Sequence, residues 1–138
     1  MSREIKFRAW DKDEKRMLEV YRIGFDGPID GAQVYCYLDD RGAKGSKECF
    51  YDGDGLTLEQ FTGLKAANGD DIYENDLVSL DPDDPPYQVI FDEGKFELSN
   101  DDLKLIYDLS ETHMDCDIVG NIHENPELLE AQHDTRTD

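Results

Sequence analysis

The chain has 138 residues, with 34 Asp and Glu against 14 Lys and Arg, which gives a formal net charge of −20. Its 38% hydrophobic residues exclude a disordered chain, and its length predicts a single domain over residues 1–132 with a flexible acidic tail over residues 133–138. No apolar run reaches the roughly 18 residues of a membrane span, and the first residues lack the apolar segment of a signal peptide. Three cysteines without close spacing favour reduced thiols, so the expected location is the cytoplasm.

The negative charge is concentrated in the second half of the chain. Residues 1–65 hold 11 basic and 13 acidic residues, whereas residues 66–138 hold 3 and 21. Binding to nucleic acid or to an anionic membrane requires cations, so direct contact of the acidic half with either is disfavoured. A basic surface on another protein is the natural partner. Two other interpretations stay open: a solvated surface that only maintains solubility, and adaptation to high salt.

The first half is predicted to consist of short strands. Residues 4–10 alternate between apolar and polar side chains, and residues 17–25 form a second run suited to a strand, so together they predict an N-terminal hairpin. Segment 27–31, which contains glycine and proline, ends this hairpin. Residues 34–38 and 49–51 are two further strand candidates, and a loop rich in glycine and charge separates them.

The middle of the chain contains a helix signal, a hairpin signal and a loop. Thr57 and Gln60 have the spacing of a capping box, which predicts a short helical turn. Asn68-Gly69 predicts a hairpin, because both residue types tolerate the positive φ of a type I′ turn. Residues 77–80 are a strand candidate, and the three prolines of residues 81–86 force a loop after it.

The last third is predicted to continue as strands and to end in a helix. Residues 87–91 and 95–98 form a second hairpin around a tight turn, residues 101–109 fit either period, and residues 117–122 are a final strand. Pro126, preceded by a capping asparagine, begins a short C-terminal helix. The expected fold is therefore mainly β, a small antiparallel β-barrel or sandwich with hairpins and a short C-terminal helix.

Three segments occur in a characteristic order: IKFRAWD at residues 5–11, FTGLKAANGDDIYENDLVSL at residues 61–80, and IVGNIHENPELL at residues 118–129. Together they resemble the signature of the YopX family, small proteins of bacteriophages and prophages. The resemblance covers the beginning, middle and end of the chain, and it implies a fold family and a biological setting but no reaction. The matching residues that we single out are Phe61, Gly63, Leu64, Asn68, Gly69, Tyr73, Glu74, Asp76, Gly120, Asn121, Asn125 and Pro126.

The central motif is interpreted as structural. Asn75 replaces the usual glycine of the resemblance, and Asn is the best non-glycine residue for a left-handed turn. Asp76 is well placed to cap that turn with its side chain. The alternative interpretation is that Tyr73, Glu74 and Asp76 form a binding site. At the end of the chain, His123 stands where an aromatic residue is more usual.

Two groups of residues are candidates for binding a partner. The first consists of acidic residues in or beside predicted turns: Asp81, Asp83, Asp84, Asp92, Glu93, Asp101 and Asp102. The second is the pair Arg8 and Trp10 on the polar face of the first strand, where an exposed Trp–Arg pair is typical of an interface anchor. The alternative is that Trp10 closes the end of the core and that Arg8 stacks on it.

The sequence contains no complete catalytic or metal-binding motif. Segment 52–55, DGDG, resembles the start of a calcium loop but lacks the later ligands, so a turn is expected. His113 and Cys116 have a spacing that suits zinc, with His123 not far away, yet a fourth ligand is missing. Phosphate loops and nucleophile elbows do not occur. We therefore expect a non-enzyme without metal or other cofactor.

These observations lead to a binding function as the expected one. A phage or prophage accessory protein would present its acidic residues to a basic protein surface, imitate nucleic acid, and inhibit a DNA-binding or defence protein in the cytoplasm of the host cell. The alternative is a structural or assembly protein that forms a homo-oligomer, with the acid serving only solubility. A metal-dependent hydrolase is a distant third interpretation.

Overall fold

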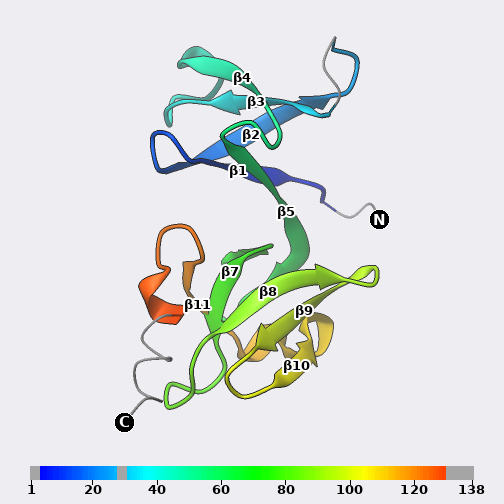
Figure 1. Cartoon of the computed structure of the whole chain (residues 1–138), viewed down its shortest axis with the longest axis vertical. Coiled ribbons are helices and arrows are strands. Elements are labelled where there is room, and N and C mark those ends of the chain that lie inside the picture. The colour runs from blue at the N-terminus through cyan, green and yellow to red at the C-terminus, as the bar shows by residue number, and fades with distance from the viewer. Residues whose placement is uncertain (1–3, 28–30, 130–138) are drawn as a thin grey trace. The chain divides into compact units, whose positions relative to one another are not determined.

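The computed structural model describes residues 4–27 and 31–129, and these are mainly β (Figure 1). The chain divides into two compact units, residues 1–60 and residues 61–138. The single domain expected over residues 1–132 thus contains two compact units, and the tail expected over residues 133–138 lies outside the described residues. None of the described helices is long and apolar enough to cross a membrane.

A six-stranded antiparallel sheet contains every strand of the first unit, and its residues 61–65 and 71–73 belong to the second unit. Its order is β4-β3-β2-β1-β5-β6, with β1 Phe7–Asp11, β2 Arg16–Gly24, β3 Gln33–Tyr37, β4 Lys47–Tyr51, β5 Leu56–Lys65 and β6 Asp71–Tyr73. Alternate side chains of β1, β2, β3 and β5 form a small core, as period-two patterning requires. The buried members of this core are Ala9, Leu18, Val34, Cys36 and Leu56. A 3₁₀ turn, Gly42–Lys44, precedes β4.

The second unit contains a five-stranded antiparallel sheet. Its order is β10-β9-β8-β7-β11, with β7 Asp76–Ser79, β8 Tyr87–Asp92, β9 Lys95–Asn100, β10 Leu105–Asp108 and β11 Asp117–Asn121. The α-helix α1, Leu109–Thr112, and a 3₁₀ turn, His113–Asp115, connect β10 to β11. The buried core of this unit consists of Ala66, Ile72, Val78, Tyr87, Val89, Leu98, Leu109 and Cys116.

The predicted fold class is confirmed, except for the closure of a barrel. Both sheets are antiparallel, and short helices are minor elements. Within the described ranges, β4 does not pair with β6 and β10 does not pair with β11, so each sheet keeps two free edges. A closed barrel requires its edge strands to pair, so the open, β-rich sandwich class is the alternative that fits.

The predicted helical turn at residues 57–60 is wrong. These residues belong to β5, where Leu58 lies opposite Ala9 and Thr57 lies opposite Trp10 of β1. A capping box is a local signal that helps a helix only where no strand competes for the same backbone groups. Here the pairing with β1 supplies those partners.

The Asn68-Gly69 hairpin is present, but its turn type differs from the predicted one. Gly69 has a φ of +92°, whereas Asn68 is not among the residues with positive φ. The Gly69 N–H donates to the Ala66 carbonyl, and the Ala66 N–H donates to the Asp70 carbonyl. This is a three-residue loop in which only the glycine needs the left-handed region.

The end of the described chain begins a helical turn as predicted. The N–H groups of Leu128 and Leu129 donate to the carbonyls of Asn125 and Pro126, and helical backbone begins at residue 127. The Oδ1 of Asn125 accepts a hydrogen bond from the Asn121 N–H at 3.2 Å, a contact that the sequence did not predict.

Candidate functional site

Two acidic connections leave the five-stranded sheet at the same end. Because β7, β8, β9 and β10 follow one another as antiparallel neighbours, the β7–β8 loop and the β9–β10 turn share one end and the β8–β9 turn lies at the other (Figure 1). The shared end carries five of the predicted partner-binding residues, and we call this group the acidic end: Asp81, Asp83, Asp84, Asp101 and Asp102. Asp117 pairs with Ser79 and therefore begins β11 at this end too.

The remaining two acidic candidates lie elsewhere. Asp92 and Glu93 form the β8–β9 turn with Gly94, and Asp92 pairs with Lys95 across the hairpin. Glu93 and Gly94 both have positive φ, 49° and 84°, which is the geometry of a type I′ turn. The seven predicted residues therefore do not form a single group.

Asn100 joins the two connections of the acidic end. Its Nδ2 donates to the carbonyls of Pro85 and Pro86 at 3.1 and 3.2 Å, and its Oδ1 accepts from the Leu103 N–H at 3.0 Å. Asn100 is 3% exposed, so these bonds form away from water. A buried amide with all these partners fixes the loop and the turn against each other.

The β7–β8 loop is held from within by Asp81. The Oδ1 of Asp81 accepts from the Asp83 N–H at 2.9 Å, and its carbonyl accepts from the Asp84 N–H at 3.0 Å. Asp83 and Asp84 themselves are exposed. Burial raises the pKa of Tyr87, at the start of β8, and the neighbouring Tyr107 and Asp84 raise it further. The loop thus has three exposed carboxylates, and that of Asp81 also holds the loop backbone.

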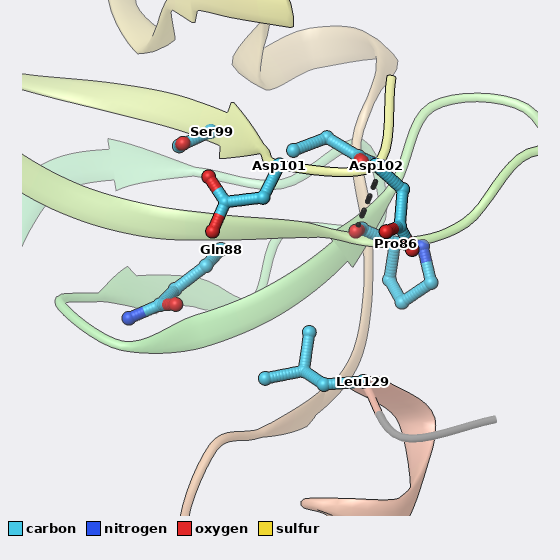
Figure 2. A pocket seen from close by; sticks show the side chains of 7 residues that line it. Pro86, Gln88, Ser99, Asp101, Asp102 and Leu129 are labelled. Carbon is cyan, nitrogen blue, oxygen red and sulfur yellow. Dashed lines mark hydrogen bonds between the residues drawn. The ribbon is translucent and has the colours of Figure 1, made fainter. Parts of the chain in front are cut away.

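A small pocket lies between the two connections (Figure 2). Its lining residues are Pro86, Gln88, Ser99, Asn100, Asp101, Asp102 and Leu129, and its volume is about 110 Å³. Figure 2 shows Gln88, Asp101 and Leu129 around this space, and the lining combines polar and carboxylate groups with the apolar side chains of Pro86 and Leu129. The cation nearest in sequence is Lys104, in the same turn as Asp101.

The central family motif contains a turn between β6 and β7. Asn75 has a φ of 71°, and the Oδ2 of buried Asp76 accepts from the Tyr73 N–H at 2.8 Å, as the sequence predicts. The ring of Tyr73 lies 5.6 Å from that of Phe61. The turn interpretation therefore accounts for Asp76.

The two later motif segments meet in space, which the sequence did not reveal. The Ile122 N–H donates to the Asn75 carbonyl at 3.1 Å. Asn121 is buried, and its Oδ1 accepts from the N–H groups of His123 and Glu124 at 3.0 and 2.9 Å. These motif residues thus hold the start of β7 and the end of β11 together.

Arg8 and Trp10 are not exposed anchors. Trp10 is 8% exposed, and the Nε of Arg8 donates to the Oε1 of buried Glu59 at 2.8 Å. Burial of Trp10 agrees with the alternative in which it closes the core. Arg8 neutralises the buried carboxylate of Glu59 in β5. The sequence did not predict this pair, because the two residues are far apart in the chain.

The weak metal motifs have structural explanations. The Sγ of buried Cys116 donates to the Thr112 carbonyl, and the Nδ1 of His113 lies 2.8 Å from the Lys65 carbonyl oxygen. Asp52 belongs to a turn after β4, where its Oδ1 accepts from the Leu58 N–H. Within residues 4–27 and 31–129, no group of three or more His, Cys, Asp or Glu side chains could hold a metal ion.

Comparison with known proteins gives one family. The family model described as YopX protein matches residues 6–130. The crystal structure of protein EF1440 from Enterococcus faecalis is similar, with 31% identity, a TM-score of 0.62, and coverage of 93% of this chain and 99% of that one. Protein yopX from Bacillus subtilis shares the fold at 17% identity and a TM-score of 0.57, over 90% of this chain and 97% of that one. No curated protein matches at a significant level. The chain belongs to the YopX family.

Proposed function

We propose that this chain is a non-enzymatic accessory protein of phage or prophage origin, which acts in the cytoplasm of the host cell by binding a basic protein surface. Its contact surface is the acidic end of the five-stranded sheet. The partner is a nucleic-acid-binding protein of the host, such as a DNA-binding or defence protein, whose cationic surface accepts carboxylates in place of phosphates. The protein itself does not bind nucleic acid or membrane directly.

The observation that carries this proposal is the connection of two acidic segments through Asn100. Its hydrogen bonds to Pro85, Pro86 and Leu103 fix the loop that carries Asp83 and Asp84 against the turn that carries Asp101. Charges held in place by the fold lose less entropy on binding than charges on a free tail. Electrostatic complementarity then gives fast association and selectivity for a cationic partner.

A binding role also agrees with how the family motif residues are used. Asp76 and Asn121 accept backbone N–H groups, and the Oδ1 of Asn125 accepts one as well. Carboxylates and amides engaged in this way hold turns and are poorly placed for proton transfer. This supports a protein without an active site made from the motif.

The experiment compares two double charge reversals in a capture from host lysate. Asp83→Lys with Asp101→Lys changes the acidic end, and Asp92→Lys with Glu93→Lys makes the same change in net charge at the opposite end of the sheet. All four residues are exposed, so both variants should fold. Asp81 is left unchanged because it holds the β7–β8 loop.

The first variant should lose partners that the wild type captures, and the second should keep them. Capture by the wild type should decrease as the salt concentration rises from about 50 to 300 mM, because the Debye length shrinks across that range. Equal loss in both variants would indicate that net charge alone matters. Equal retention in both would refute the proposal.

The structural alternative has an observation in its favour. Asp92 and Glu93 lie at the opposite end of the sheet from the acidic end, so acidic residues are not confined to one place. Carboxylates distributed over a surface maintain solubility without a partner. An assembly protein of this kind would form homo-oligomers and would bring down no basic protein in the capture experiment.

A further inference from the structure

The pocket of the acidic end brings three polar side chains to one small space. Asp101 contributes a carboxylate, Ser99 a hydroxyl and Gln88 an amide, and Figure 2 shows the Asp101 carboxylate directed towards Gln88. Gln88 and Ser99 lie opposite each other on β8 and β9, so their side chains leave the same face of the sheet. The three groups therefore meet at a volume of about 110 Å³.

The two amide nitrogens of this lining already donate within the protein. The Nδ2 of Asn100 donates to the carbonyls of Pro85 and Pro86, and the Nε2 of Gln88 donates to the Oδ1 of Asn75 at 3.1 Å. Within residues 4–27 and 31–129, neither the Gln88 Oε1 nor the Asp101 carboxylate accepts a hydrogen bond. An occupant of the pocket that satisfies both must bring several donors, and a positive charge matches the carboxylate.

The rest of the wall is apolar. Pro86 and Leu129 line the same pocket, and Figure 2 shows its space between Asp101 on one side and Leu129 on the other. A long cationic side chain combines a charged head with an apolar stem and fits such a pair of walls. A small inorganic cation would leave the apolar wall without a contact.

We propose that the pocket binds the guanidinium group of an arginine from the basic partner, an inference that rests on the proposed function for the identity of that partner. A guanidinium has five donors in one plane, so it can donate to both oxygens of Asp101 and still reach the Gln88 Oε1. It is more weakly hydrated than an ammonium, so it loses less than lysine would on entering a partly apolar pocket. Arginines are among the residues that contribute most to the binding energy of protein interfaces.

The test is a titration of the full chain with small probes, followed by NMR in about 0.15 M salt. The probe is N-acetylarginine methylamide, and its matched control is N-acetylcitrulline methylamide, in which a neutral urea replaces the guanidinium. The arginine probe should shift the backbone signals of Ser99 and Asp101 and the side-chain amide signals of Gln88. The citrulline control should shift none of them, and N-acetyllysine methylamide should bind several-fold more weakly than the arginine probe.

Because a net charge of −20 attracts any cation, a pair of variants locates the binding. Asp101→Asn removes the carboxylate of the pocket with little change in shape, and Asp92→Asn makes the same change at the opposite end of the sheet. Both residues are exposed, so both variants should fold. Asp101→Asn should weaken binding of the arginine probe several-fold, whereas Asp92→Asn should bind it like the wild type.

Three results would overturn the proposal: equal binding of the arginine and citrulline probes, equal binding of the arginine and lysine probes, or wild-type affinity in Asp101→Asn. The capture from lysate is a separate measurement. If the double reversal of Asp83 and Asp101 abolishes capture but the arginine probe leaves Gln88 and Ser99 unshifted, the proposed function stands and the pocket is not an arginine site. If the probe binds in the pocket but both double reversals keep their partners, the proposed function fails and the arginine site stands.

Discussion

Arg8 of β1 and Glu59 of β5 lie opposite each other, and the Arg8 Nε donates to the Glu59 Oε1 at 2.8 Å while the Glu59 side chain is fully buried. A buried carboxylate is tolerated only where a cation and hydrogen bonds replace its water. This pair therefore explains why the strand that contains Phe7 and Ala9 also contains an arginine.

Removal of this arginine should strongly destabilise the first unit. Arg8→Ala leaves a buried carboxylate without its cation, which should lower the free energy of unfolding by about 3–5 kcal/mol. Urea denaturation of the variant measures the change. Lys44→Ala is the control, because Lys44 is exposed, and this variant should cost less than about 0.5 kcal/mol. Equal losses in the two variants would contradict the structure.

Gly120 should tolerate no side chain. A β-carbon built there would lie 2.6 Å from Cγ and 2.9 Å from Cβ of Asn125, so Gly120→Ala would displace the amide that accepts the Asn121 N–H. Overpacking of this kind should cost about 1–3 kcal/mol. The neighbouring Val119 is exposed, and Val119→Ala should cost less than about 0.5 kcal/mol. Thermal unfolding followed by circular dichroism compares the two variants.

Asn100→Ala should loosen the acidic end. The substitution removes the donor to Pro85 and Pro86 and the acceptor of the Leu103 N–H. Leaving such buried groups unpaired should cost about 1–3 kcal/mol. Hydrogen exchange at the Leu103 amide should become faster, while the amides in the middle of β8 stay protected. Ser99→Ala, at the adjacent position, should leave the Leu103 exchange rate unchanged.

The three thiols should differ in reactivity. The pKa of Cys36 and of Cys116 is raised to about 11, mainly by burial and to a smaller extent by neighbouring groups, whereas Cys49 is exposed. Because the thiolate is the reactive form, a thiol reagent at pH 8 should modify Cys49 alone in the native chain. Unfolding in urea should make all three available. Fast modification of a second thiol in the native protein would place Cys36 or Cys116 at the surface.

Acid should release one contact of the first unit at a defined pH. Hydrogen bonds from the Arg41 side chain and backbone lower the pKa of Asp39 from 3.8 to about 2. Because the folded pKa lies below the unfolded one, this contact contributes its full stability above pH 4 and loses it as the pH falls towards 2. NMR titration of the carboxyl carbon should show the pKa returning towards 3.8 in Arg41→Gln. An unchanged pKa would exclude Arg41 as the cause.

Local turn chemistry was readable from the sequence. Two turns were predicted from residues that accept a positive φ: Asn75, which stands in place of a glycine, and Glu93-Gly94. The loop at residues 81–86 was predicted from its prolines, which lack the N–H that a strand needs. The prediction of β5 failed because its partner, β1, is distant in the sequence. Strand pairing between residues far apart in the sequence cannot be predicted from the local pattern of a few residues.

The candidate site was predictable in composition but not in arrangement. The sequence identifies which acidic residues lie in turns, yet whether Asp92 and Asp101 share an end depends on the order of strands in the sheet. Likewise, the apolar run Leu105–Tyr107 fits either a helix or a strand as a pattern. Its position at an edge is a property of the assembled sheet.

The border between the two compact units falls between residues 60 and 61, inside β5 rather than in a linker. The first residues of β5 pair with β1, and Phe61 and Lys65 pair with β6. A protease that cuts exposed, flexible segments would find no substrate there, and an inserted domain would break a strand that both units need. Genetic exchange between related genes should therefore carry the two units together, so that the family varies as a whole rather than by exchange of halves.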